Sequence, residues 1–176
     1  YYNQDLLRDF WFNKHSTGLS VQDMAGAVPC IISGGNVTQG SGDTLNIVAG
    51  VGYTNFSVEV PDSWSSKPPT KKSEDVICRV AWAQQTNLAI GSATLNGVAT
   101  NYVKVAYSET AQNTRSRVKK AGTYSSEKLP SFTIACDTSA PTAYQVVLAT
   151  VVGSTGGTFT IINYLALGTT VISDSN

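Results

Sequence analysis

The clearest pattern of apolar and polar residues lies in the last quarter of the chain. Two runs rich in β-branched residues, 144–152 and 158–165, flank the turn Gly153-Ser154-Thr155-Gly156-Gly157. Such a pattern is typical of two buried strands joined as a hairpin. No acid, base or thiol interrupts it, so the best-defined part of the chain indicates architecture and binding rather than catalysis.

Shorter apolar runs separated by turn residues predict further strands upstream. The expected strands are residues 30–33, 36–38, 44–49, 53–60, 75–83, 86–94, 100–107 and 132–136. Asn96-Gly97 suits a type I′ turn, which predicts a hairpin that pairs residues 86–94 with 99–107. The glycine pairs at 34–35 and at 40 and 42 precede β-runs rather than helices, so we interpret them as turns and not as phosphate cradles.

Two polar stretches, residues 61–73 and 108–130, lack this alternation, and we expect them to be long connections. The first carries Trp64 near Pro68-Pro69, which is either a binding anchor or a clamp for its own loop. The second carries Arg115, Arg117, Lys119 and Lys120. This basic segment is either a solvated loop or a contact to an acidic neighbour or an anionic cell-surface polymer.

The N-terminal residues follow a helical period instead. Apolar side chains recur between Asp5, Arg8 and Asp9, and they form the expected assembly face Leu6, Leu7, Phe10 and Trp11. A helix of this length is marginal alone in water, so its face must pack on its own domain, on copies of itself or on another protein.

We therefore predict a mainly β protein, an antiparallel sandwich or partly closed barrel preceded by an N-terminal helix. Residues 1–27 would form a helical attachment segment, and residues 28–176 would form the antiparallel β-domain. The first residues show no signal-peptide pattern, and no apolar run reaches the roughly 18 residues that cross a membrane.

Composition and charge restrict the partners. Charged residues make up 14% of the chain, and 12 basic side chains balance 12 acidic ones. This neutrality disfavours nucleic acid and anionic membranes as partners. It suits a subunit packed within a large assembly.

The chain offers little for catalysis or metal binding. Cys30, Cys78 and Cys136 are widely spaced and sit in apolar surroundings, so we expect buried free thiols and no zinc site. His15 is the sole histidine, and no nucleophile elbow accompanies it. The scattered carboxylates do not suggest a glycosidase pair. We expect no enzymatic activity, no cofactor and no metal.

Several segments together resemble a known family. They are Asp5-Leu6-Leu7-Arg8-Asp9-Phe10-Trp11, Ile31-Ile32-Ser33-Gly34-Gly35, the strand 44–53, the strand 101–107 and the C-terminal hairpin. In this order they resemble the β-domain of tail-fibre and baseplate-associated structural proteins of tailed bacteriophages and prophages.

The resemblance implies a virion protein of the phage tail, synthesised in the host cytoplasm, that attaches or extends tail fibres. Its partners would be other tail proteins and copies of itself, with trimers usual in such families. One alternative is a carbohydrate-binding host-recognition module that uses a host-surface glycan, with Trp64, Trp82 and Tyr102 as candidate aromatics. Another is a capsid or head-decoration protein.

Overall fold

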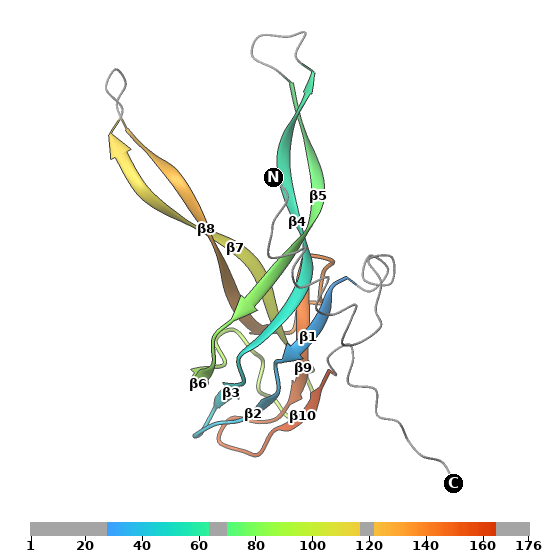
Figure 1. The fold of residues 1–176 in the computed structure, drawn as a ribbon. Coiled ribbons are helices and arrows are strands. Elements are labelled where there is room, and N and C mark those ends of the chain that lie inside the picture. The colour runs from blue at the N-terminus through green and yellow to red at the C-terminus, as the bar shows by residue number, and fades with distance from the viewer. Residues whose placement is uncertain (1–27, 64–69, 117–121, 165–176) are drawn as a thin grey trace.

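The computed structural model describes residues 28–63, 70–116 and 122–164, and within them the chain forms ten strands and no helix (Figure 1). The strands are β1 (Cys30–Gly34), β2 (Val37–Gln39), β3 (Thr44–Ile47), β4 (Gly50–Ser63), β5 (Thr70–Trp82), β6 (Gln85–Ala89), β7 (Asn101–Ser116), β8 (Thr123–Asp137), β9 (Gln145–Val152) and β10 (Thr160–Asn163). The predicted N-terminal helix, residues 1–27, lies outside the described residues.

The strands form three antiparallel sheets, in the orders β1-β4-β5, β10-β9-β7-β8 and β2-β3-β6. The prediction of a mainly β, antiparallel fold is therefore confirmed. The sheets pack on one another in a sandwich-like body and remain open at their edges, so the alternative of a partly closed barrel is wrong for this part of the chain.

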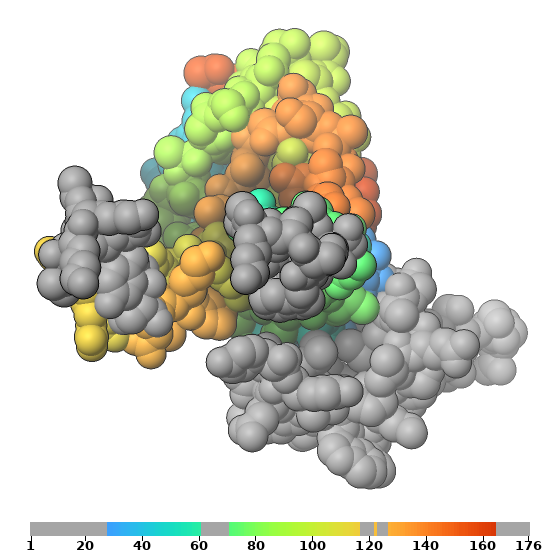
Figure 2. Space-filling view, turned by 90° about the horizontal axis from the view of Figure 1, so that it is seen from above, coloured from blue at the N-terminus to red at the C-terminus, as the bar shows by residue number. Residues whose placement is uncertain are grey.

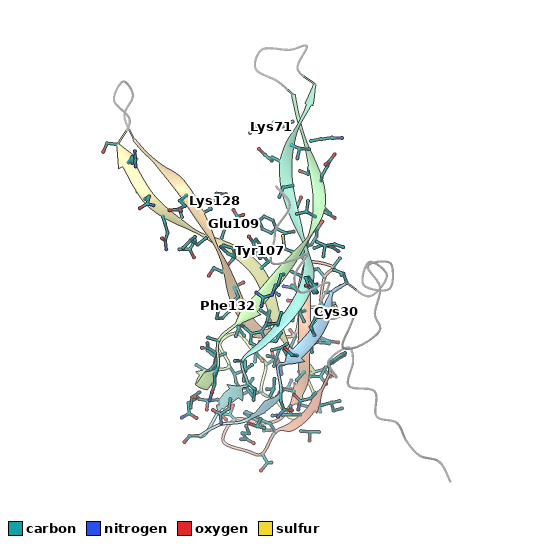
Figure 3. The ribbon with its side chains drawn as sticks, viewed as in Figure 1. Cys30, Lys71, Tyr107, Glu109, Lys128 and Phe132 are labelled. Carbon is teal, nitrogen blue, oxygen red and sulfur yellow. The ribbon has the colours of Figure 1, made fainter. Side chains whose placement is uncertain are left out.

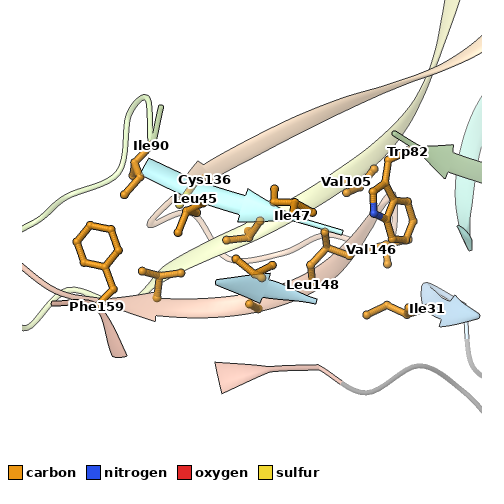
Figure 4. Close-up of a cluster of buried hydrophobic side chains, with 14 of the residues drawn as sticks. Ile31, Leu45, Ile47, Trp82, Ile90, Val105, Cys136, Val146, Leu148 and Phe159 are labelled. Atoms are coloured by element: carbon orange, nitrogen blue, oxygen red, sulfur yellow. The ribbon is translucent and has the colours of Figure 1, made fainter. Parts of the chain in front are cut away.

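One hydrophobic core joins the three sheets (Figure 4). Leu45 and Ile47 of β3, Trp82 of β5 and Leu148 of β9 are at most 3% exposed. Alternation drives this burial: every second side chain of a strand points to the same face, and these strands place apolar residues on that face. The Trp82 indole Nε1 donates to the carbonyl of Val48 at 3.0 Å, so the ring is buried with its polar atom paired.

The predicted C-terminal hairpin is confirmed. β9 and β10 pair antiparallel from Thr160↔Val152 to Asn163↔Ala149, across the glycine-rich turn. β9 also pairs with β7 and so lies inside its sheet. This position explains its nearly continuous apolar sequence.

The prediction of a hairpin at Asn96-Gly97 is wrong. β6 pairs with β3, whereas β7 pairs with β8 and β9, so the flanking segments belong to different sheets. Gly97 does have a positive φ of 82°, but Asn96 does not. The Asn96 Oδ1 instead accepts hydrogen bonds from the amides of Val98 and Ala99, at 3.1 and 2.8 Å. The Asn96 side chain thus closes a local turn, and the strands before and after this turn do not pair with each other.

The prediction of two long loops is also wrong. β4 and β5 stay paired from Gly50↔Trp82 to Ser63↔Thr70, and β7 and β8 stay paired from Tyr102↔Asp137 to Ser116↔Thr123. These two hairpins leave the body as separate projections (Figure 1), which we call the β4–β5 arm and the β7–β8 arm. Residues 71–75 of β5 and 108–116 of β7 are almost entirely polar, so no apolar alternation marked these parts of the arms as strands.

Candidate functional site

Few of the residues predicted to form contacts can be placed. Arg115 lies on the outer part of β7, exposed and opposite Tyr124. The other predicted contact residues lie outside the described residues: Leu6, Leu7, Phe10, Trp11, Trp64, Arg117, Lys119 and Lys120. The expected contact role of the basic segment and of the N-terminal face therefore stays a prediction.

One of the three candidate aromatics for a glycan platform is excluded. Trp82 is 3% exposed and belongs to the core, because β5 turns it inward against β9. Trp82 therefore cannot present a flat face to a ligand.

The described residues offer no site for metal chemistry. Among them, no cluster of three or more His, Cys, Asp or Glu side chains could hold a metal ion. All three cysteines are free thiols, with Cys30 and Cys136 buried and Cys78 half-buried. The Glu74 carboxylate is already in an ion pair, with its Oε1 2.8 Å from Lys72 Nζ. None of the described segments forms a helix that could cross a membrane.

The candidate site is a hollow of about 330 Å³ at the base of the two arms. It forms where two inner pairings end: β1 pairs with β4 only as far as Tyr53, and β9 pairs with β7 only as far as Ala106. Beyond these points no described strand continues the pairing along these edges of β4 and β7. The hollow is lined by Asn55, Phe56, Ser57, Ala106, Tyr107, Thr142, Tyr144 and Gln145.

Two aromatic rings form one wall. Phe56 of β4 and Tyr107 of β7 meet edge to face, with ring centroids 4.8 Å apart and planes at 69°. Burial, with the negative charge of Glu109 adding to it, raises the pKa of Tyr107 to about 12. Tyr107, Glu109 and Lys128 lie on the side of the β7–β8 arm that faces the other arm (Figure 3). Lys128 forms an ion pair with Glu109, with Nζ and Oε2 2.9 Å apart. Because the pKa of Tyr107 is raised, its phenol is neutral at physiological pH.

The opposite wall is the segment that leads into β9. The Tyr144 hydroxyl donates to the Asp75 carboxylate, with both carboxylate oxygens at 3.0 Å, and this contact raises the pKa of Tyr144. The backbone amide of Asn55 donates to the carbonyl of Ala143 at 3.3 Å. The segment is thus tied to β5 through a side chain and to β4 through the backbone.

Hydrogen bonds also fix the turn itself. The Thr142 amide donates to Gln145 Oε1 at 3.2 Å, and the Tyr144 amide donates to Thr142 Oγ1 at 3.3 Å. Within the described residues, the Gln145 Nε2 amide, the Asn55 side chain and the Ser57 hydroxyl have no such partner. Three neutral polar groups therefore remain available around an aromatic hollow.

The sequence did not reveal this site. Its lining comes from three distant segments, 55–57, 106–107 and 142–145, and none of them contains a recognisable motif. The one available signal was the pair Tyr144-Gln145 after Pro141-Thr142, a turn-forming stretch that carries an aromatic ring and an amide into the start of a strand. No family model, curated protein or solved structure matches this chain.

Proposed function

We propose that this chain is a non-enzymatic structural subunit whose two arms contact neighbouring subunits of a larger assembly. The observation that carries the proposal is the exposure of the arms. Residues 71–76 of β5, 109–116 of β7 and 127–130 of β8 are all exposed. At about 3.4 Å per residue, β7 extends about 30 Å beyond Tyr107.

The arms have little to stabilise them in isolation. The side chains packed against the main core reach only as far as Tyr107 and Phe132 on the β7–β8 arm. Farther out, largely exposed ion pairs link the two strands of each arm: Lys128–Glu109, at 2.9 Å, in the β7–β8 arm and Lys71–Glu59, at 2.7 Å, in the β4–β5 arm. Such pairs contribute little stability. A two-stranded hairpin alone in water is marginally stable. Packing against a neighbour would supply the buried surface that the arms lack.

The shape of the arms favours contacts between subunits. Seen from above, the β7–β8 arm stands clear of the body (Figure 2). Its outer β7 segment places Thr110 and Gln112 opposite Leu129 and Glu127 of β8, and all four residues are exposed. Leu129 thus leaves an apolar side chain on the arm that packing against a neighbour would remove from water.

The resemblance to phage tail-fibre and baseplate proteins supports a more specific placement. Under this proposal the chain is a virion component that attaches or extends tail fibres, assembled as a homo-oligomer with other tail proteins. The zero net charge of the chain suits this setting. A head-decoration protein would use the arms in the same way, and the position of the chain in the particle distinguishes the two.

Sedimentation equilibrium tests the role of the arms. The full chain should sediment as a multiple of 18.6 kDa. Gln112→Arg and Thr114→Arg together place two bulky charges on the β7–β8 arm and should shift the protein towards monomer. Thr38→Arg, at an exposed position of β2 on the body, is the matched control and should leave the mass unchanged. Equal masses for the parent chain, the Gln112→Arg/Thr114→Arg double variant and the Thr38→Arg control would contradict the proposal.

A further inference from the structure

We propose that the outer part of β5 pairs with the same strand of a second copy of the chain, antiparallel and about a two-fold axis at Ser73. This contact rests on the proposed assembly role of the arms, and it specifies the partner and the register at one of them. β5 is the outermost strand of the sheet β1-β4-β5, so its edge away from β4 is hydrogen-bonded to no other described strand. Residues 71–76 are all exposed, and Lys71 marks the outer part of the β4–β5 arm (Figure 3).

The pairing of β4 with β5 identifies the backbone groups that face this open edge. The Asn55 amide donates to Ala143 and so points away from β5, which makes Asn55 and Ile77 a non-hydrogen-bonded pair. The register is unbroken from Ile77 to Lys71, which lies opposite Pro61, a residue with no amide hydrogen to donate. Every second residue of β5 therefore points its N–H and C=O groups to the open edge. In the outer part these residues are Lys71, Ser73 and Asp75.

The charges along this edge are self-complementary. The five residues centred on Ser73 read Lys-Lys-Ser-Glu-Asp, two cations and two anions about a neutral residue. An antiparallel pair centred on Ser73 places Lys71 opposite Asp75 of the second copy. It also places Lys72 opposite Glu74, on the other face of the sheet. The two-fold axis repeats both contacts, so each face gains two cross-strand pairs of opposite charge, and such pairs stabilise a sheet.

The same charges disfavour the neighbouring registers. Charged side chains on an edge strand normally discourage pairing with another chain. An axis at Lys72 would put two ammonium groups directly opposite each other, and an axis at Glu74 would put two carboxylates there. Like charges in these positions destabilise a strand pair. Of the registers centred on residues 71–75, the one at Ser73 alone brings opposite charges together, so the pattern selects it by repulsion as well as by attraction.

The existing partners of these side chains leave them accessible. Lys71 is 67% exposed in its ion pair with Glu59, and the pair formed by the next two charges of the edge leaves about half of each side chain exposed. The Tyr144 hydroxyl donates to Asp75 as a neutral phenol, so the carboxylate keeps its negative charge. Ion pairs this exposed contribute little, and an ammonium group has further donors for a second partner.

Pairing would also supply the stability that the arm lacks. Lys71, Ser73 and Asp75 would each exchange two backbone hydrogen bonds with the second copy. Two hairpins would then form one antiparallel sheet of four strands in the order β4-β5-β5-β4. A hairpin alone is marginal in water, whereas a sheet of three or more strands can be stable.

Sedimentation equilibrium of charge-reversed full chains tests the contact. Lys71→Glu with Lys72→Glu makes the edge wholly acidic. Glu74→Lys with Asp75→Lys makes it wholly basic. Each variant alone should associate with a Kd about tenfold or more above that of the parent at low ionic strength, because like charges then face each other. A 1:1 mixture should recover the parent association, since each acid then faces a base.

The chain that carries all four reversals is the matched control. Its edge has acids first and bases second, so it is again self-complementary and should associate as the parent does. A general loss of folding or solubility from the substitutions would not be reversed in this way. Far-UV circular dichroism of each variant should match that of the parent.

Ser73→Cys tests the register. Cα atoms of a hydrogen-bonded antiparallel pair lie about 5.5 Å apart, which is within the range that a disulfide spans. Mild oxidation should therefore link two copies into a covalent dimer on a non-reducing gel. Thr38→Cys, at an exposed position of β2 on the body, should remain unlinked, as should the parent chain.

Three outcomes would overturn the proposed contact. The first is parent-like association of both charge-reversed variants. The second is a mixture that associates no better than its components. The third is equal cross-linking of Ser73→Cys and Thr38→Cys. A monomeric parent chain would contradict the assembly role of the arms as well. If the parent associates and responds to Gln112→Arg/Thr114→Arg but not to the β5 variants, only the β5 contact is wrong.

Discussion

Lys104 and Asp137 form a buried ion pair that allows a sharp test of the packing in the main sheet. The Lys104 Nζ lies 2.8 Å from Asp137 Oδ1 and donates to the carbonyl of Ser139 at 3.0 Å. The side chain of Lys104 is 3% exposed, whereas that of Asp137 is 22% exposed. The two charges therefore differ in their access to water, and removing one or the other should have unequal effects.

Asp137→Ala should be the more damaging change. It leaves an ammonium group in the interior with a single carbonyl partner, and breaking a buried pair in this way costs about 3–4 kcal/mol of unfolding free energy. Lys104→Met replaces the buried charge with an apolar chain of similar length. Asp137 then keeps its bond from the Ser139 amide at 2.8 Å and gains water, so this change should cost about 1 kcal/mol or less.

Urea unfolding of the parent, both single variants and the double variant measures this asymmetry. Once Lys104 is replaced, loss of the Asp137 carboxylate should matter little, so the double variant should lie within about 1 kcal/mol of Lys104→Met. Equal costs for the two single changes, or simple additivity in the double variant, would refute the reasoning from burial.

The pair also predicts a pH dependence. The hydrogen bond from Lys104 holds the pKa of Asp137 below its ordinary value of 3.8. A carboxyl group whose pKa is lowered by folding stabilises the protein fully above its unfolded pKa, and this contribution is lost as the pH falls through the folded pKa. The stability difference between the parent and Lys104→Met should therefore be constant near neutral pH and shrink below about pH 4.

Three further substitutions or reactions test other parts of the fold. Gly97→Val should lower the unfolding free energy by about 1 kcal/mol or more, because Gly97 has φ 82° and a Cβ there would lie 2.8 Å from Ser154 Oγ; an unchanged urea midpoint would contradict this. Asn101→Ala should cost about 2–3 kcal/mol, since the buried amide bonds both the N–H and the C=O of Thr94. Burial, followed by the charge of Asp137, raises the pKa of Cys136 to about 11, so iodoacetamide at pH 8 should label this thiol only after unfolding. Mass spectrometry that finds Cys136 labelled in the folded protein would contradict this expectation.

The parts of the fold that the sequence predicted correctly are those with a buried face. Leu45, Ile47, Val103 and Val105 lie on strands expected from alternation, and the β9–β10 hairpin follows from its two apolar runs. Lys104 shows the limit of such reasoning. A lysine between two buried valines indicates a solvent-facing position, yet Lys104 is buried, with Asp137 at the end of β8 and Ser139 just after it as partners.

The arms and the hollow escaped prediction for related reasons. A strand with solvent on both faces has no apolar periodicity in its sequence, so the exposed residues 71–73 of β5, 109–116 of β7 and 127–130 of β8 were interpreted as loops. Asn96-Gly97 carries a strong local hairpin signal, but the competing partners β3 and β9 determine where its neighbours pair. The hollow depends on where pairing ends between strands that are distant in sequence, and this is a property of the tertiary register.

The central claim is that the arms are assembly contacts, and a cryo-electron microscopy map of the oligomer formed by the full chain tests it most directly. The account predicts that the exposed parts of the arms, residues 71–76, 109–116 and 127–130, are buried against neighbouring subunits. A map in which both arms project into solvent while the subunits associate through the sandwich-like body would contradict the account.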